Sequence, residues 1–375
     1  MTSIQSIEQN VFFELIRAGL WEQDVELRKY GDTSYSQILH LAQEQSVVGL
    51  IAAGVERVRD VRVPQTMALS FAGAVLQLEQ RNRTMNEFVA GLIVQLQKAD
   101  VYALLVKGQG IAQCYARPLW RACGDVDLLM SPDNYEKAKA LLVPQADSVE
   151  QEFMFLKHLG MSISGWEVEL HGTQRPRLTK RIDRVVDEVQ EDMFCRGKVR
   201  SWINGQTQVF LPGIDEDVIF VFTHILHHYY QEGIGLRQIC DWSRLLWTYR
   251  DSLDVALLEK RLRKMGLMNE WRAFGAYVVD YLGMPVEAMP LYSADARWSI
   301  KAHRINEFVM EVGNFGHKRA GSGSGLKAQG FVARKAVSLL RRTADSVRHF
   351  ITFPGNSLKI WWYMVWTGLK VVRGE

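Results

Sequence analysis

In this chain of 375 residues, acidic and apolar side chains alternate in one short segment, residues 123–130, which reads CGDVDLLM. A period of two predicts a β-strand and puts Asp125 and Asp127 on one face, with Cβ atoms roughly 6–7 Å apart. Two neighbouring carboxylates repel each other unless a cation lies between them. Because Mg²⁺ takes oxygen ligands and leaves positions for phosphates, the segment is a candidate platform for phosphoryl or nucleotidyl transfer. The alternative is a solvent-facing strand that happens to carry two aspartates.

A second alternating segment, EVELH at residues 167–171, contributes a third carboxylate. As a strand it places Glu167, Glu169 and His171 on one face. If this strand lies in the same sheet, it brings Glu169 or Glu167 beside the two aspartates. Three carboxylates suit a site for two metal ions, in which one ion activates the attacking oxygen and the other holds the leaving phosphates.

A strand-and-turn segment precedes both acidic strands. The apolar run VYALLV at 101–106 predicts a strand, and Lys107-Gly108-Gln109-Gly110 follows it. Glycines between a strand and a helix let backbone N–H groups approach a phosphate, and Lys107 adds a positive charge. Taken alone, this segment fits an ordinary strand-to-helix turn equally well. Its place just before the acidic strand favours phosphate binding.

The rest of the chain is mostly helical in its hydrophobic period. Helical spacing covers the first hundred residues, including 9–20, 34–53 and 67–99, and it returns after residue 213. Between these regions, short strands alternate with helices. We therefore expect an α+β fold, with a small mixed β-sheet core flanked by N-terminal and C-terminal helical regions. The expected division is an N-terminal helical region (1–99), an α/β core (100–210), a C-terminal helical region (211–316) and a basic, aromatic-rich tail (317–375).

The ordered motifs resemble a bacterial family of uncharacterised nucleotidyltransferases in the DNA polymerase β-like nucleotidyltransferase superfamily. The resemblance extends over about residues 35–250 and rests on the following residues: Lys107-Gly108, Tyr115, Pro118, Arg121, Gly124-Asp125-Val126-Asp127-Leu128-Leu129 and Glu169-Leu170-His171. It implies a sheet of this superfamily and a nucleotidyltransferase core at 100–210. One position departs from the superfamily pattern, because Gln109 stands where Ser or Gly is usual.

The resemblance also implies the roles of individual residues. Asp125 and Asp127 would be metal ligands, and Glu169 would be a third ligand or the base that accepts the proton of the acceptor hydroxyl. Lys107, Gly108 and Arg121 would lie near the nucleotide phosphates. The implied reaction is a Mg²⁺-dependent, two-metal transfer of a nucleotide from a nucleoside triphosphate (NTP), with in-line attack at the α-phosphorus.

Several functions remain open at this level. The acceptor could be a sugar, a small metabolite, a protein or an RNA end. A catalytically silent nucleotide-binding or scaffold protein of the same fold is the main alternative, which Gln109 keeps open. A kinase-like phosphotransferase is disfavoured because we find no H-x-D followed by Asn and a later metal-binding Asp. RNA polymerisation is disfavoured because the catalytic segment has no basic stripe with interleaved aromatic residues.

A helical segment at 215–230 contains three histidines. His224 and His228 share a face at i, i+4, as in some zinc-binding helices, but no Glu follows His224 as in H-E-x-x-H. We favour the interpretation that this helix packs beneath the active site, with a histidine near the nucleotide. The alternative is a metal site that includes His227. Arg237 and Asp241 have the spacing of an ion pair on one helix face.

Charge is distributed unevenly along the chain. The net charge is +3, but residues 317–375 contain eleven Lys or Arg and two acidic residues, whereas the first 316 contain 34 basic and 40 acidic residues. The tail includes IWWYMVW at 360–366. Basic, Trp-rich amphipathic segments bind membrane interfaces, so peripheral membrane contact is one hypothesis. The other is that these aromatic residues complete the core of the protein.

Location is predicted from two further features. The N-terminal residues lack the basic and apolar regions of a signal peptide, and the longest apolar run has only seven residues. The four cysteines are widely spaced, which is typical of a reducing compartment. We therefore expect a cytoplasmic protein.

Overall fold

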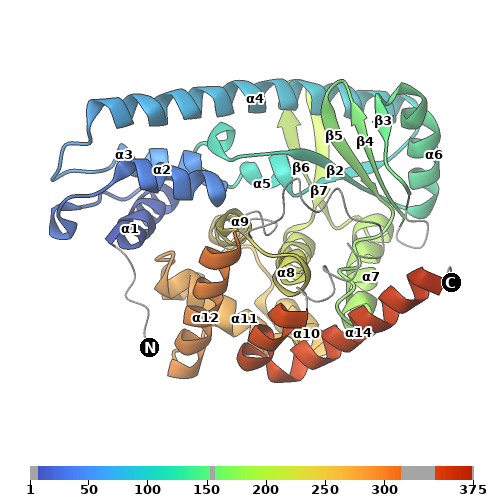
Figure 1. The fold of residues 1–375 in the computed structure, drawn as a ribbon. Coiled ribbons are helices and arrows are strands. Elements are labelled where there is room, and N and C mark those ends of the chain that lie inside the picture. The colour runs from blue at the N-terminus through green and yellow to red at the C-terminus, as the bar shows by residue number, and fades with distance from the viewer. Residues whose placement is uncertain (1–6, 153–156, 314–342, 374–375) are drawn as a thin grey trace.

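The computed structural model describes residues 7–152, 157–313 and 343–373, and it has the α+β architecture that was expected (Figure 1). A small mixed sheet lies between a long helix on one face and a helical body on the other. The fold class is therefore confirmed, whereas the domain boundaries at residues 99, 210 and 316 stay predictions.

The N-terminal region is helical, as its hydrophobic period predicts. Its helices are α1 (Ile7–Trp21), α2 (Tyr35–Glu44), α3 (Val48–Val55) and α4 (Gln65–Lys98). The helical spacing over 34–53 is interrupted between α2 and α3, where Ser46 has a φ of 56°. Gln45 explains the break, because its side chain accepts from Leu236 N at 2.8 Å and donates to Val309 O at 3.2 Å. These partners are distant in sequence, so the interruption is a tertiary effect.

Among the described residues the main sheet has five strands in the order β1-β2-β5-β4-β3. The strands are β1 (Ala103–Val106), β2 (Asp125–Met130), β3 (Ser148–Val149), β4 (His158–Ile163) and β5 (Trp166–His171). Strands β2 and β5 are parallel, and the other neighbours are antiparallel. Strand β4 begins at His158, directly after residues 153–156 and Lys157, and residues 153–156 lie outside the described part of the chain.

The two faces of the sheet have different neighbours. Val126, Leu128 and Val168 belong to an apolar cluster with α4 and with α6 (Pro132–Leu142). The opposite face, which carries the acidic residues, looks toward the helical body. A second sheet, the hairpin of β6 (Val199–Asn204) and β7 (Thr207–Pro212), lies beside β1 and α4.

The helical body follows this hairpin and is built around buried aromatic side chains such as Trp242 and Trp271. Its helices are α8 (Ile214–Gln231), α9 (Leu236–Thr248), α10 (Val255–Met265), α11 (Met268–Asp280) and α12 (Ala296–Val312). Helix α5 (Gly108–Ala112) follows β1, helix α7 (Lys180–Cys195) follows β5, and the tail ends in α14 (Pro354–Arg373). Helix α8 has apolar residues on nearly every side, as a helix in the middle of a body requires.

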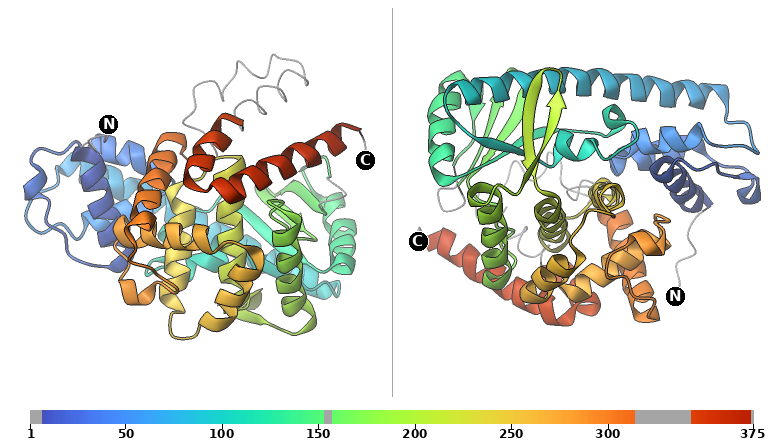
Figure 2. Two further views of the ribbon diagram at one scale, coloured as in Figure 1. Left: turned by 90° about the horizontal axis from the view of Figure 1, so that it is seen from below. Right: turned by 180° about the vertical axis from the view of Figure 1, so that it is seen from behind.

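The tail is partly core and partly surface. The Gly/Ser-rich segment at 320–325 lies outside the described residues, and residues 343–352 are helical. Helix α14 follows, and it runs along the lower edge of the molecule in the right-hand view of Figure 2. Phe353 and Ile360 are buried, whereas Leu358 is 59 % exposed and Trp362 is 66 % exposed. Within the described residues, no helix combines the length and apolar character that crossing a bilayer requires.

Candidate active site

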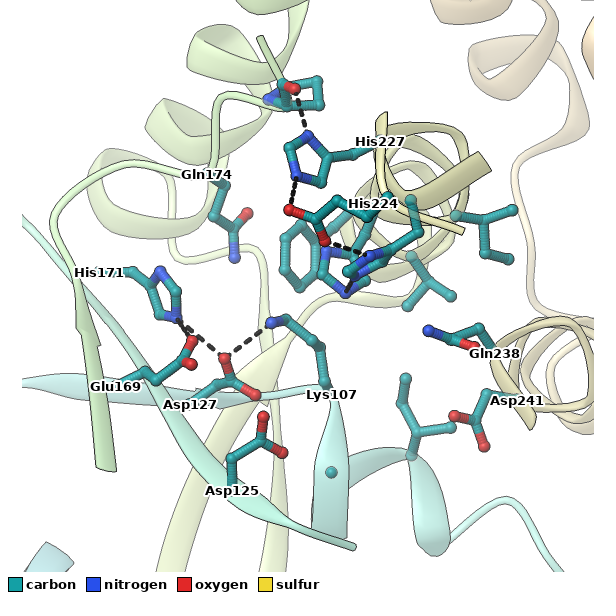
Figure 3. A pocket seen from close by; sticks show the side chains of 18 of the residues that line it. Lys107, Asp125, Asp127, Glu169, His171, Gln174, His224, His227, Gln238 and Asp241 are labelled. Carbon is teal, nitrogen blue, oxygen red and sulfur yellow. Dashed lines mark hydrogen bonds and ion pairs between the residues drawn. The ribbon is translucent and has the colours of Figure 1, made fainter. Parts of the chain in front are cut away.

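The acidic face of the sheet forms one wall of a cavity of about 370 Å³ (Figure 3). The turn between β1 and α5, the strands β2 and β5, and the loop at 173–177 supply one side. Helices α8 and α9 supply the other. The cavity therefore lies between the two parts of the chain that the sequence distinguished as core and C-terminal helical region.

Strand pairing brings three carboxylates together at this wall. In the parallel register, Asp125 is opposite Glu167 and Asp127 is opposite Glu169. Oxygens of Asp125, Asp127 and Glu169 all lie within 4.8 Å of one another. Glu167 is exposed and does not line the cavity. Of the two glutamates that the alternating pattern allowed, the structure thus groups Glu169 with the aspartates.

The crowding of negative charge is visible in Asp125. The charge of Asp127 raises the pKa of the Asp125 carboxyl, and burial raises it further, while the ammonium of Lys107 acts in the opposite direction. A divalent cation bound between these carboxylates would remove the repulsion. The oxygen-rich group therefore fits a hard cation such as Mg²⁺.

Two basic side chains partly neutralise Asp127. Lys107 Nζ donates to Asp127 Oδ1 at 2.7 Å, and His171 Nε2 lies 2.9 Å from the same oxygen. Lys107 has a φ of 56° at the end of β1, where the backbone turns into α5. Burial alone would lower the pKa of Lys107, but the nearby Asp127, Glu169 and Asp125 raise it overall.

A pair of histidines surrounds Glu169. His158 Nε2 and His171 Nε2 each lie 3.3 Å from Glu169 Oε2. Burial would raise the pKa of Glu169, but contacts with His158 and His171 hold it well below its usual range. His158 comes from β4, opposite His171 in the antiparallel register. Sequence reasoning missed His158, although a two-residue turn at Ser164-Gly165 between β4 and β5 would have placed these residues opposite each other.

The turn that follows β1 divides its residues between the cavity and the core. Gly108 lines the cavity with a φ of 32°, close to the carbonyl of Asp125. Gln109 is buried away from it, and its Nε2 donates to Asn82 Oδ1 at 3.0 Å. The side chain that departs from the superfamily pattern is therefore a structural residue that ties the turn to α4.

Arg121 lines the cavity, but its guanidinium is already paired. Its Nε and Nη2 donate to the two carboxylate oxygens of Asp241 at 3.1 and 2.6 Å, and Nη1 contacts Cys123 Sγ at 2.7 Å. Asp241 therefore pairs with Arg121, whereas Arg237 donates to Ala122 O at 2.8 Å. The phosphate contact expected of Arg121 stays a prediction.

The opposite wall is a chain of histidines on α8. His224 Nε2 lies 2.9 Å from His228 Nε2, and His228 Nδ1 lies 2.9 Å from Glu232 Oε2. His227 Nδ1 lies 2.8 Å from Pro176 O. Burial lowers the pKa of His224 far below its usual value, and neighbouring positive charges add to the effect. Among the described residues, the groups with metal-binding geometry do not include these histidines, which favours the interpretation that they pack beside the active site.

Gln174 is a further polar residue of the cavity that sequence reasoning missed. Its side chain is buried, and neither amide atom has a hydrogen-bond partner among the described residues. Figure 3 shows this side chain between His171 and His227. Buried polar atoms usually have partners, so this amide is available to a ligand. No pattern in the sequence marks it.

Comparison with known proteins identifies the family of the chain. The model of the family described as uncharacterised nucleotidyltransferase matches residues 32–283. The chain belongs to this family. The matched residues include β1, β2 and β5, and therefore all three grouped carboxylates. No curated protein and no solved structure matches the chain.

Proposed function

We propose that this member of the family is a Mg²⁺-dependent enzyme that transfers a nucleotide from an NTP to a hydroxyl group of an acceptor. One observation carries the proposal: the parallel pairing of β2 with β5 collects Asp125, Asp127 and Glu169 within 4.8 Å at one wall of the cavity. Family membership supports the transferase class. The donor, the cation and the acceptor group are the parts that we propose.

Asp125, Asp127 and Glu169 would hold the divalent cations. Their oxygen donors match the preference of Mg²⁺, and a bound cation would relieve the repulsion from Asp127 that raises the pKa of Asp125. Bound Mg²⁺ would neutralise the phosphate oxygens and favour attack at the α-phosphorus. Glu169 is either the third ligand or the base that takes the proton of the acceptor hydroxyl.

The protein's own side chains would position the substrates. Lys107 is held at the carboxylate cluster by Asp127, and it can move to a phosphate oxygen once a cation takes over its role. Gly108 leaves room for a phosphate to approach the backbone at the end of β1. The side-chain amide of Gln174, which has no hydrogen-bond partner among the described residues, can both donate to and accept from a nucleotide or a polar acceptor.

The direct test is incubation of the purified protein with each labelled NTP and Mg²⁺, with and without cell extract. Mass spectrometry of the protein and of small molecules would then reveal the nucleotide adduct and release of pyrophosphate. We expect one NTP to be consumed and its nucleotide to appear on a hydroxyl. Binding of NTP without consumption, in the presence of every acceptor pool, would instead support the silent nucleotide-binding alternative.

We also propose that the tail makes peripheral contact with anionic membranes. Leu358, Trp362 and Trp366 recur at intervals of four on α14, and all three are exposed. The excess of basic residues after residue 316 would attract an anionic surface. Sedimentation with anionic vesicles tests this. The Trp362→Ser variant should bind less than the native protein, and equal binding to neutral and anionic vesicles would contradict the proposal.

A further inference from the structure

A second possible ligand group adjoins the three carboxylates and differs from them in chemistry. It consists of His158, His171 and Glu169, whose nearest ligand atoms lie within 4.8 Å of one another. The two histidines come from the antiparallel pair β4 and β5, and they face each other with ring centroids 4.8 Å apart. Glu169 belongs to both groups.

The distances in this group match those between the ligands of a metal ion better than those of good hydrogen bonds. Both imidazole nitrogens lie 3.3 Å from Glu169 Oε2. Donor–acceptor distances in N–H···O bonds are usually about 2.7–3.2 Å. Tetrahedral coordination with bonds of about 2.0–2.1 Å separates neighbouring ligand atoms by about 3.4 Å. A metal ion could therefore replace these contacts at the distances that Glu169 already keeps from both histidines.

The types of ligand indicate which ion would bind. Mg²⁺ prefers oxygen, whereas imidazole nitrogen favours Zn²⁺ and other first-row transition ions. Two His and one Glu are also a set found in catalytic zinc sites, where three protein ligands leave a position open for water or substrate. All three side chains line the cavity, so an open position would face the space where a substrate binds.

We propose that His158, His171 and Glu169 bind a Zn²⁺-class ion, and that Glu169 bridges it to the hard cation held by Asp125 and Asp127. His171 Nε2 lies 2.9 Å from Asp127 Oδ1. When both ions are bound, His171 would coordinate the Zn²⁺-class ion instead, and Asp127 Oδ1 would coordinate the hard cation. The centre would then hold two chemically different ions. This site does not depend on nucleotidyl transfer, since it can be loaded and measured without a nucleotide.

The test measures binding of Zn²⁺ and Co²⁺ to the full chain in the absence of nucleotide and Mg²⁺. We expect one tight Zn²⁺ site in competition with a chromophoric chelator, and visible d–d absorption when Co²⁺ binds. His158→Gln should weaken Zn²⁺ binding at least about 100-fold, because loss of even an outer partner of a metal ligand costs about 10–100-fold. His158 is partly exposed, so this variant should fold, which circular dichroism and the melting temperature would verify.

Two comparison variants make the result decisive. Asp125→Asn should change Zn²⁺ affinity less than about tenfold, since Asp125 belongs only to the oxygen-rich group. His40→Gln, which alters a surface histidine paired with Glu44 at 3.4 Å, should leave the affinity unchanged. Native affinity in His158→Gln would overturn the proposal. So would a loss in Asp125→Asn as large as that in His158→Gln, because the ion would then occupy the carboxylates.

Discussion

The two walls of the cavity are both polar, but they differ in charge. The sheet wall crowds Asp125, Asp127 and Glu169 together, and mutual repulsion raises the pKa of Asp125. The helix wall carries His224 and His228, and burial lowers the pKa of both, which favours their neutral forms. A bound cation would relieve the repulsion in the sheet wall, whereas the hydrogen-bonded rings of the helix wall carry no such crowded charge. We therefore propose that the sheet wall performs the chemistry and that the helix wall shapes the site.

The largest effect should follow from changing the sheet wall. We expect Asp125→Asn and Asp127→Asn each to lower Mg²⁺-dependent NTP turnover at least about 100-fold, because each removes a carboxylate that stabilises the reacting centre through its cation. Initial rates of pyrophosphate release measure this. Native rates in both variants would mean that the cavity is not the active site.

The same two variants should differ in stability without divalent cations. Asp125→Asn removes a repelled charge and should raise the melting temperature. Asp127→Asn should lower it, because Lys107 and His171 would lose their shared anionic partner. Differential scanning calorimetry in the presence of a chelator measures both. Equal shifts in the same direction would contradict the assignment of charges in this wall.

The next prediction compares two glutamates of one strand. Glu169→Gln should lower turnover about 100-fold, whereas Glu167→Gln, which alters an exposed residue, should change it less than about twofold. Both variants remove one negative charge from the same face of β5, so Glu167→Gln is the matched control. Greater sensitivity at Glu167 would show that the parallel register of β2 and β5 differs from the one described here.

A further prediction concerns the helix wall. His224→Gln should reduce kcat/KM about tenfold and leave the affinity for Mg²⁺ unchanged, since His224 lines the cavity but belongs to no described metal-binding group. His303→Gln, which alters a partly exposed histidine on α12, is the control. Titration of activity against Mg²⁺ separates the two effects. A large rise in the Mg²⁺ requirement of His224→Gln would mean that the walls share the cation.

The smallest effect on catalysis is expected at Asp183, a buried carboxylate on α7 that does not line the cavity. Burial raises the pKa of Asp183 on α7 to about 6, against hydrogen bonds from Arg177 N and the Tyr363 hydroxyl. Because the folded state binds this proton more tightly than the unfolded state, the contribution of Asp183 to the free energy of unfolding falls as pH rises from about 4 through about 6.

In Asp183→Asn, the free energy of unfolding should therefore fall by up to about 3 kcal/mol less over this pH range than in the native protein, and turnover should be unchanged. Urea denaturation at pH 4.5 and pH 7.5 measures the difference. Glu191→Gln, which alters an exposed carboxylate further along α7, is the control. An unchanged pH dependence in Asp183→Asn would show that burial does not act on this group as described.

Comparing the walls also separates what could and could not be predicted from the sequence. Alternation in 123–130 and 167–171 identified the strands and the acidic faces, because side-chain direction in a strand follows local geometry alone. The choice of Glu169 over Glu167 required the resemblance to the family, and it depends on the register between two strands whose paired residues, such as Asp127 and Glu169, are 42 positions apart. The helix wall was recognised only as a group of histidines, since their partners Pro176 and Glu232 become apparent only after folding.

By itself, the sequence determined the α+β class, most helices, the carboxylate-bearing strands and the amphipathic tail, because hydrophobic period and strand alternation are local properties. The tertiary structure alone determined which cations and anions meet. It paired Arg121 with Asp241, turned Gln109 into the core, and left the side-chain amide of Gln174 in the cavity without a hydrogen-bond partner among the described residues. Each of these outcomes depends on strand register or on helices meeting across long separations, and contacts of that kind leave no periodic signal in the chain.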